Sequence, residues 1–511
     1  MKKVVDNYSL LFLPPAVWPV FDHAVEIALK YCSENPSKKL FIVFLDNALR
    51  FNPSFLWFDF ISRSESIAKY NSIKNLFISY NCEFINLKKD KNKSIIYSKS
   101  VKRLSKQCAI NSIQSQYKDT SINYKGEKKN QIKKVSYDFL DGYSFFKKNC
   151  FNLNNLDKVI LFNGRFGFYR GVLEFCKCRD IFYNCFEYPV QGRKRYLFTY
   201  NSPIHNLNYR ANELKKIADK YPLSIEKKIS IGKSWLQKRN SQRMGYEINF
   251  SKNQNEFNIP KVIRQAREKK KKVILVLNSS EWEWSAFKES RTNYFDSQFN
   301  TFKWLVKNFS KKNKDTFFIF KFHPQFAFRD LIYKEKVELL LKRFNKNQIY
   351  IIQPESKLNT KALSKFSDLI LTFYTSAAPE ASLSGKKVIS IGPASFQYFN
   401  CCQMVKSKDD LKKIILEKSY LRKKDFSRVE MNTYLFFFAR CFQGLKPKFL
   451  KYDKYKKPFL ITNGNKIYFY QPKLKFFFLR LIRVFLFVLR HPERIKFKNL
   501  YRITNIFNLN F

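Results

Sequence analysis

The stretch from Ser367 to Gly392, SDLILTFYTSAAPEASLSGKKVISIG, contains the polar residues best placed to do chemistry. Its pattern predicts an apolar strand, a polar turn at Thr375 and Ser376, a short helix that carries Glu380, a glycine stop and a second apolar strand. Backbone N–H groups and hydroxyls at such a turn bind anions in α/β sheets, and a carboxylate one turn later can accept hydrogen bonds from sugar or ribose hydroxyls. An ordinary βαβ unit with Glu380 in water would give the same pattern.

A second polar pair follows an apolar run in the segment 313–324, NKDTFFIFKFHP. The run FFIF predicts a buried strand, and Lys321 and His323 follow at its carboxyl end, where parallel sheets bind ligands. Pro324 ends the strand. A His-Pro dipeptide alone is weak evidence, but one at a strand end upstream of a Thr-Ser turn is more specific.

A third set of polar residues follows the apolar strand predicted at 159–162. A turn at Asn163 is favoured by the glycine after it, and Arg165 and Arg170 lie just beyond. An arginine pair suits an anionic acceptor or a donor phosphate. Equally, both arginines could be surface residues paired with Glu174 and Asp180.

Two residues are candidates for the base that deprotonates an acceptor hydroxyl. Glu187 follows the apolar run IFYNCF, although an ion pair with Arg193 or Arg195 is the alternative. His23 lies early in a helix predicted at 18–31, where a packed or solvated histidine is the favoured alternative.

The order of these segments resembles the C-terminal domain of GT-B glycosyltransferases of the capsule-polysaccharide type. This group includes bacterial sialyltransferases, Kdo transferases and polyglycerophosphate synthases. The resemblance implies that the His-Pro histidine and the Ser/Thr turn hold the donor's phosphates and that the downstream glutamate binds the nucleotide ribose. The matching residues are His323, Thr375, Ser376 and Glu380, and Lys321 could add positive charge.

The resemblance covers roughly residues 159–392. The segment VILVLNSSEWE at 273–283 is similar to the first strand and polar loop of the C-terminal domain, and Gln298 lies in the next predicted helix. The segments VILFNGRFGFYRGVLE at 159–174 and CFEYPVQGR at 185–193 are similar to upstream parts of these proteins.

Alternating strands and helices in both halves predict an α/β protein with two Rossmann-like, doubly wound domains. The resemblance to GT-B proteins implies that the two domains face a cleft. We expect an acceptor-side domain at 1–215 with a basic loop at 89–134, a linker at 216–247, a nucleotide-sugar-binding domain at 248–440 and a basic aromatic tail at 441–511. The tail segment 473–490, KLKFFFLRLIRVFLFVLR, predicts a basic amphipathic helix. It would lie on an anionic membrane or pack back on the first domain.

Composition limits the partners. The net charge is +55, but lysines are spread along the whole chain and no nucleic-acid-binding signature occurs, so we expect no specific nucleic-acid partner. With four histidines and no C-x-x-C pair, no metal site is predicted. No secretory signal precedes the first strand, so we expect a cytoplasmic protein with reduced cysteines, peripheral on the inner face of the cytoplasmic membrane.

These features predict a glycosyltransferase that works without a metal or other cofactor. It would move a sugar, or a polyol phosphate, from a nucleotide-activated donor to a surface polysaccharide or a lipid-linked acceptor. His323 would stabilise the departing phosphate, and Glu187 or His23 would be the base. A nucleotide-sugar 2-epimerase and a non-catalytic polysaccharide-assembly protein at the membrane surface are the alternatives.

Overall fold

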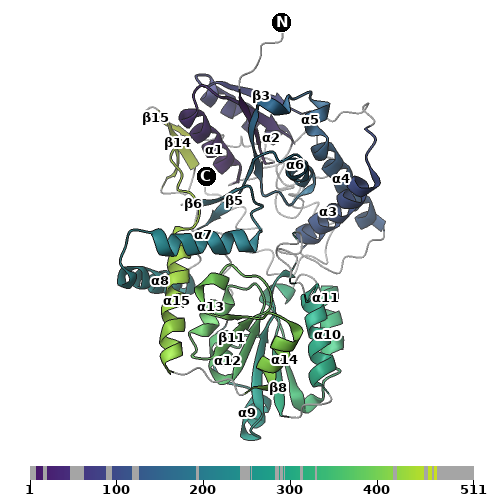
Figure 1. Cartoon of the computed structure of the whole chain (residues 1–511), viewed down its shortest axis with the longest axis vertical. Coiled ribbons are helices and arrows are strands. Elements are labelled where there is room, and N and C mark those ends of the chain that lie inside the picture. Colours follow the sequence, from purple (N-terminus) through teal and green to yellow (C-terminus); the bar gives the residue numbers. More distant parts are fainter. Residues whose placement is uncertain are drawn as a thin grey trace. The chain divides into compact units, whose positions relative to one another are not determined.

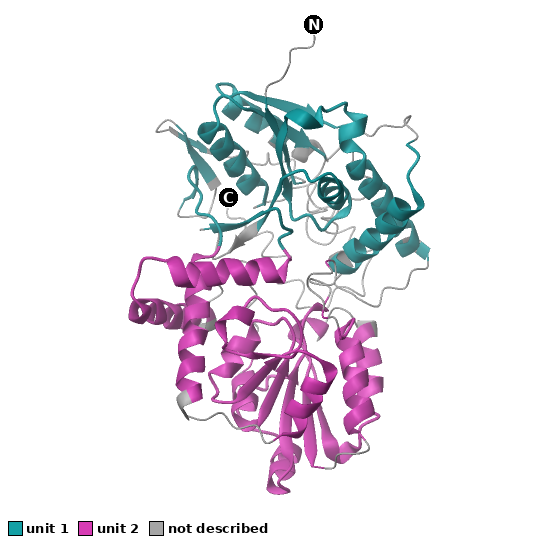
Figure 2. Cartoon of the chain, viewed as in Figure 1, with its two compact units in different colours: residues 1–117, 123–204, 444–511 teal, residues 118–122, 205–443 magenta. Residues whose placement is uncertain are grey.

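The chain folds into two compact units, which Figure 2 colours separately. Unit 1 comprises residues 1–117, 123–204 and 444–511, and unit 2 comprises residues 118–122 and 205–443. The structure is a computed structural model that describes residues 7–14, 20–45, 63–87, 95–117, 126–190, 195–241, 254, 256–281, 287, 292, 294–310, 315–327, 331–417, 423–453, 458–462 and 465–468.

The main sheet of unit 1 has six strands in the order β3-β2-β1-β4-β5-β6 (Figure 1). Its strands are β1 (Tyr8–Phe12), β2 (Lys39–Phe44), β3 (Cys82–Asn86), β4 (Leu156–Phe162), β5 (Tyr183–Val190) and β6 (Arg195–Tyr200). The first five are parallel and β6 runs antiparallel to β5. This order is that of a Rossmann fold, with the topological switch point between β1 and β4.

Helices cover both faces of this sheet. They are α1 (Val20–Glu34), α2 (Arg63–Lys74), α3 (Lys99–Tyr117), α4 (Gly126–Tyr143), α5 (Phe145–Lys148) and α6 (Gly167–Cys178). Along β1, Leu11 packs in the core beneath α1 and α2, whereas Leu10 and Phe12 pack in the core beneath α5 and α6. This alternation is the period of two expected of a strand buried on both faces.

The prediction of a basic loop at 89–134 is wrong, because α3 and the first part of α4 occupy most of this segment. Ala109 and Ile113 are buried on α3, and so are Ser105, Asn111 and Ser112. Small polar residues therefore share the inward face with the apolar ones, which hides the helical period from a hydrophobicity pattern. Most of the lysines described on these two helices are exposed, namely Lys99, Lys102, Lys106, Lys129, Lys133 and Lys134.

Part of the expected tail is also an integral element of unit 1. Strands β13 (Leu450–Tyr452), β14 (Pro458–Thr462) and β15 (Asn465–Tyr468) form an antiparallel sheet. The buried carboxylate of Glu26 on α1 accepts hydrogen bonds from the backbone N–H groups of Lys448, Phe449 and Leu450, at 2.5, 2.9 and 2.7 Å. The expectation of a tail is thus wrong for this segment, whereas residues 473–490 lie outside the described residues.

The sheet of unit 2 has six parallel strands in the order β12-β11-β10-β7-β8-β9. Its strands are β7 (Lys272–Leu277), β8 (Thr316–Lys321), β9 (Ile349–Ile352), β10 (Leu369–Thr372), β11 (Lys387–Ser390) and β12 (Gln403–Met404). Counted from β7, this is again the Rossmann order, and the switch point lies between β7 and β10. The doubly wound α/β class predicted for both halves is therefore confirmed.

Helices cover both faces of the second sheet as well (Figure 1). They are α7 (Leu207–Lys220), α8 (Ile225–Ser241), α9 (Lys261–Glu268), α10 (Gln298–Phe309), α11 (Leu331–Leu341), α12 (Thr360–Phe366), α13 (Ala377–Ser382), α14 (Lys408–Leu416) and α15 (Lys423–Phe442). Helices α8, α9, α12, α13 and α15 share one core with Val273 and Leu275 of β7, whereas α10, α11 and α14 share the other with Ile274 and Val276.

Helix α8 lies in the segment expected to be a linker, yet it packs in the core of unit 2. Trp235 stacks on Phe437 of α15 with ring centroids 5.7 Å apart. A Cβ at Gly232 would lie 2.0 Å from the carbonyl oxygen of Tyr434, so the two helices approach backbone to backbone there. Across the described ranges, no helix is long and apolar enough to cross a membrane.

Candidate functional site

The predicted donor-binding residues lie at one edge of the unit 2 sheet. Leu277, the last residue of β7, pairs with Lys321 of β8 on one side and with Thr372 of β10 on the other. The loops that follow these three strands therefore start next to one another at the carboxyl edge. This edge includes the switch point, where open α/β sheets bind their ligands.

His323 is half-buried in the loop after β8, and two hydrogen bonds fix its position. Its backbone N–H donates to Oδ1 of Asn278, at 2.6 Å, and its ring Nδ1 accepts from the backbone N–H of Gln325, at 3.3 Å. Because Nδ1 accepts a hydrogen bond from a backbone N–H, the neutral ring carries its own proton on Nε2. The side chain can therefore present an N–H donor.

Lys321 is a buried cation at the end of β8. Its side chain is 6% exposed, and Nζ donates to the backbone carbonyl of Leu358 at 2.8 Å. Loss of water around the ammonium lowers the pKa of Lys321 from its ordinary 10.5 to about 8. An anion bound nearby would stabilise the charged form.

The loop after β7 is held by Gln298, the first residue of α10. Its Oε1 accepts from the backbone N–H of Ser279 at 3.0 Å, and its Nε2 donates to the backbone carbonyl of the same residue at 3.1 Å. Oε1 of Glu281 in turn accepts from the N–H of Gln298 at 3.0 Å. All three side chains are buried, so this loop is fixed where it faces the switch point.

Thr375, Ser376 and Glu380 lie together at the start of α13, after β10. Oγ1 of Thr375 accepts from the N–H of Ala377 at 3.2 Å, which caps the short helix. Glu380 and Ser376 share a partner that the sequence did not reveal. Nη1 of Arg239 on α8 bonds to Oε1 of Glu380, and Nη2 of the same arginine donates to Oγ of Ser376 at 3.2 Å.

In unit 1, the predicted acceptor residues follow β4 beside its switch point. Asn163 has a φ of 60° and is 1% exposed, and its N–H donates to the carbonyl of Phe186 at 2.8 Å. The guanidinium of Arg165 lies 4.7 Å from the ring centroid of Phe166. Arg170 forms the ion pair with Glu174 that the alternative predicted, at 2.6 Å, although both side chains are largely buried and not at the surface.

The two candidate bases occupy different environments in unit 1. Glu187 is half-buried on β5, opposite Leu197 and beside a register shift in the pairing with β6. His23 is completely buried, and its ring centroid lies 5.5 Å from that of Tyr196. The placement of His23 fits the packed-histidine alternative, because a base must reach its substrate.

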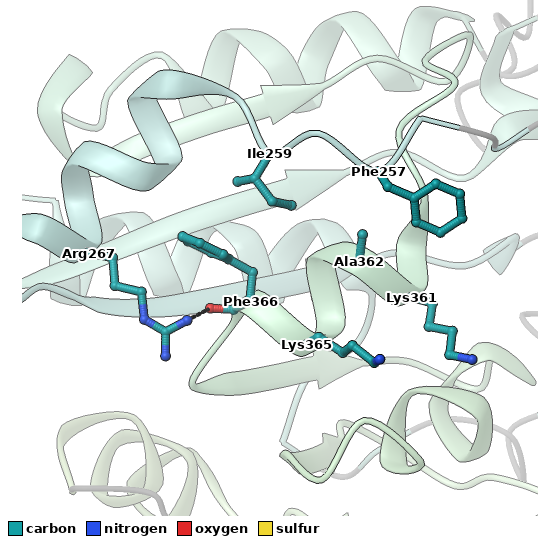
Figure 3. A pocket seen from close by; sticks show the side chains of 7 residues that line it. All are labelled: Phe257, Ile259, Arg267, Lys361, Ala362, Lys365 and Phe366. Atoms are coloured by element: carbon teal, nitrogen blue, oxygen red, sulfur yellow. Dashed lines mark hydrogen bonds between the residues drawn. The ribbon is translucent and has the colours of Figure 1, made fainter.

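A pocket of about 400 Å³ in unit 2 contains none of the predicted site residues. Its lining includes Phe257, Ile259, Arg267, Lys361, Lys365 and Phe366. Figure 3 shows Arg267 reaching the carbonyl of Phe366, which accepts its hydrogen bond at 2.7 Å. Arg267 and Phe366 precede β7 and β10 in the chain, so this end of the pocket is at the amino edge of the sheet, away from the carboxyl edge described above.

Among the described residues, no group of three or more His, Cys, Asp or Glu side chains could hold a metal ion.

Neither a family model nor a curated protein matches the chain. Solved structures similar to it include the β-Kdo 2,4-transferase KpsC of Thermosulfurimonas dismutans, with 12% identity, 64% of this chain and 88% of that chain covered, and a TM-score of 0.33.

Two further similar structures belong to other proteins. A putative UDP-N-acetylglucosamine 2-epimerase from Listeria monocytogenes has 10% identity, with 85% of this chain and 94% of that chain covered and a TM-score of 0.27. A glycosyltransferase from Rickettsia africae has 11% identity, with 85% and 96% covered and a TM-score of 0.26.

Proposed function

We propose that the chain is a GT-B-like glycosyltransferase that moves a sugar, or a polyol phosphate, from a nucleotide-activated donor to a surface or capsular polysaccharide acceptor. The observation that carries the proposal is the convergence of Lys321, His323, Ser376 and Glu380 at the carboxyl edge of a sheet with Rossmann strand order. Cationic and hydroxyl donors suit phosphates, and a carboxylate suits ribose hydroxyls.

In this mechanism the donor phosphates lie beside the N–H at Nε2 of His323 and the hydroxyls of Thr375 and Ser376. Cleavage of the bond to the transferred group leaves negative charge on the phosphate, and fixed hydrogen-bond donors stabilise that charge more in the transition state than in the ground state. Lys321 adds a positive charge, and a bound phosphate would favour its protonated form, whose pKa burial lowers to about 8. With these donors the reaction needs no metal.

On the acceptor side we propose Glu187 as the base and Arg165 as the anion-binding residue, because Asn163 is 1% exposed and Arg170 is buried in its ion pair with Glu174. Glu187 is preferred over His23 because it is partly exposed, whereas His23 is fully buried. An ionised carboxylate can accept the proton of an attacking hydroxyl. The net charge of +55 favours an anionic glycan or lipid-linked acceptor and a peripheral position at the inner face of the cytoplasmic membrane.

Calorimetric titration with CMP-, CDP-, UDP- and GDP-linked sugars tests the donor assignment. We expect one nucleotide class to bind and His323→Ala to weaken that binding about 10- to 100-fold, since a hydrogen bond to a charged group contributes about 1.5–3 kcal/mol. Lys233→Ala, an exposed cation on α8, is the control and should bind as the wild type does. Absence of binding for every nucleotide would refute the proposal.

Product analysis with the bound donor then separates a transferase from the epimerase alternative. A transferase changes the donor only when an acceptor glycan takes up the sugar, apart from slow hydrolysis. An epimerase would convert the sugar nucleotide into its epimer without any acceptor, and that result would refute glycosyl transfer.

A further inference from the structure

Arg239 in the last turn of α8 links two residues of the proposed donor site. Its Nη1 bonds to Oε1 of Glu380 and its Nη2 donates to Oγ of Ser376 at 3.2 Å. The side chains of Arg239 and Glu380 are 22% and 29% exposed. This ion pair therefore borders solvent, where a ligand can reach it.

The packing of α8 holds this arginine close to α13. Helix α8 lies beside α15 (Figure 1). Gly232 brings α8 against the backbone of α15 at Tyr434, and Trp235 stacks on Phe437 of the same helix. The guanidinium carbon of Arg239 lies 6.0 Å from the ring centroid of Trp235. The position of the helix is thus fixed by its packing on α15, so the exchange requires movement of the Arg239 side chain and not of α8.

Charge explains why an arginine is required here. A phosphate that accepts a hydrogen bond from Ser376 would lie within a few ångströms of the Glu380 carboxylate, and two anions that close repel. A guanidinium presents a planar fork of donors that matches a carboxylate and a phosphate equally well. Because Nη2 already bonds to Ser376, it is also within reach of a phosphate oxygen bound to that hydroxyl.

We propose that Arg239 is a donor-binding residue that Glu380 holds in the ligand-free chain. When a nucleotide donor binds, the guanidinium exchanges the Glu380 carboxylate for a donor phosphate oxygen. The released carboxylate of Glu380 accepts hydrogen bonds from the ribose. The inference rests on the proposed function and adds to it a phosphate-binding residue from α8, together with an internal anion that the substrate replaces.

The exchange predicts opposite effects for two probes, which calorimetry can measure on the full chain. Inorganic pyrophosphate has phosphates but no ribose, whereas CMP, CDP, UDP and GDP have both. Arg239→Ala should weaken the binding of pyrophosphate and of the nucleotide about 10- to 100-fold. Arg239→Lys should recover part of this affinity, because the lysine ammonium keeps the positive charge but lacks the planar fork of donors. Glu380→Gln should lower the affinity for the nucleotide, because the carboxylate that binds the ribose is lost. The same variant should raise the affinity for pyrophosphate, because Arg239 no longer has to leave an anionic partner.

The control is Lys233→Ala, which removes one positive charge from an exposed position on the same helix. It should leave both affinities within about twofold, which separates the specific contact from a loss of general attraction. Circular dichroism and melting temperature show that each variant is folded. Because Arg239→Lys and Glu380→Gln keep the size of the side chains, they test the exchange even if Arg239→Ala unfolds.

The possible failures are distinguishable. If the wild type binds no nucleotide, the donor site itself is refuted and this inference with it. If the wild type binds and the Arg239 variants bind equally well, Arg239 is only structural and the inference fails alone. Tighter nucleotide binding by Arg239→Ala would also overturn it, because the arginine would then merely block the site.

Discussion

Replacing Lys321 by methionine should change how the stability of unit 2 depends on pH. Burial lowers the pKa of this lysine to about 8 in the folded chain, whereas the unfolded chain has the ordinary 10.5. Between these two values the unfolded state binds more protons than the folded state. The free energy of unfolding of the wild type therefore rises with pH in this window, and Lys321→Met removes that contribution.

The two pKa values determine the size of the effect. At about pH 7 the depressed pKa costs about 3 kcal/mol of stability, and at about pH 9.5 it costs about 1.4 kcal/mol, so the wild type should gain about 2 kcal/mol relative to the variant over this range. At neutral pH the variant avoids the cost of the buried charge. It also loses the hydrogen bond to the Leu358 carbonyl, which costs about 1–3 kcal/mol, so the net change there should be small or stabilising.

The measurement is denaturant unfolding of the two proteins at a series of pH values, with the difference between them taken at each pH. The difference cancels the titration of every group that both proteins share. Lys233→Met, at an exposed position of α8, should give a curve parallel to that of the wild type. Parallel curves for Lys321→Met as well would refute the reasoning, because they would show that the ammonium remains hydrated in the folded chain.

Two further predictions concern the packing of each unit. Gly232→Ala should destabilise unit 2 by about 1–3 kcal/mol, because the new Cβ would lie 2.0 Å from the Tyr434 carbonyl oxygen. On an open helix face the same substitution would raise the melting temperature. A higher melting temperature of the variant would therefore contradict this contact. Glu26→Gln should destabilise the C-terminal segment of unit 1 by about 2 kcal/mol, because the carboxylate accepts three backbone N–H groups. Hydrogen exchange at the Leu450 amide should then become faster, and unchanged protection would argue against this anchor.

The sequence predicted the central strands of both sheets because these strands are buried on both faces. Such strands appear as unbroken apolar runs, as in VILVL at 273–277 and FFIF at 317–320, and the structure places β7 and β8 there. Polar residues that directly follow these runs must lie at the carboxyl edge of the sheet. For that reason Lys321, His323 and Thr375 could be grouped without knowledge of the strand order.

The same reasoning failed where burial did not follow hydrophobicity. Helices α3 and α4 bury serine, asparagine and glutamine side chains, so a lysine-rich segment with two regular helices was interpreted as a loop. The segment after residue 444 contributes short strands anchored by a single glutamate on α1. No local sequence pattern predicts a contact between residues that are more than 400 positions apart.

Arg239 illustrates most clearly why a site cannot be derived from motifs alone. It lies 141 positions before Glu380, in a helix whose charged sequence fits a solvent-exposed connection between domains. Gly232 and Trp235 pack α8 on α15 and so bring Arg239 to the proposed donor site, and neither residue is polar or adjacent to a motif. From the sequence alone, Glu380 is predicted to bind a ribose, with no other side chain as its partner. In the folded chain it already holds a cation, so a ligand must displace one partner of that ion pair and can use the other. In the proposed exchange, the affinity of the site for a nucleotide is a difference between two competing ion pairs, and the internal Arg239–Glu380 pair contributes to the selection of a phosphate-bearing donor.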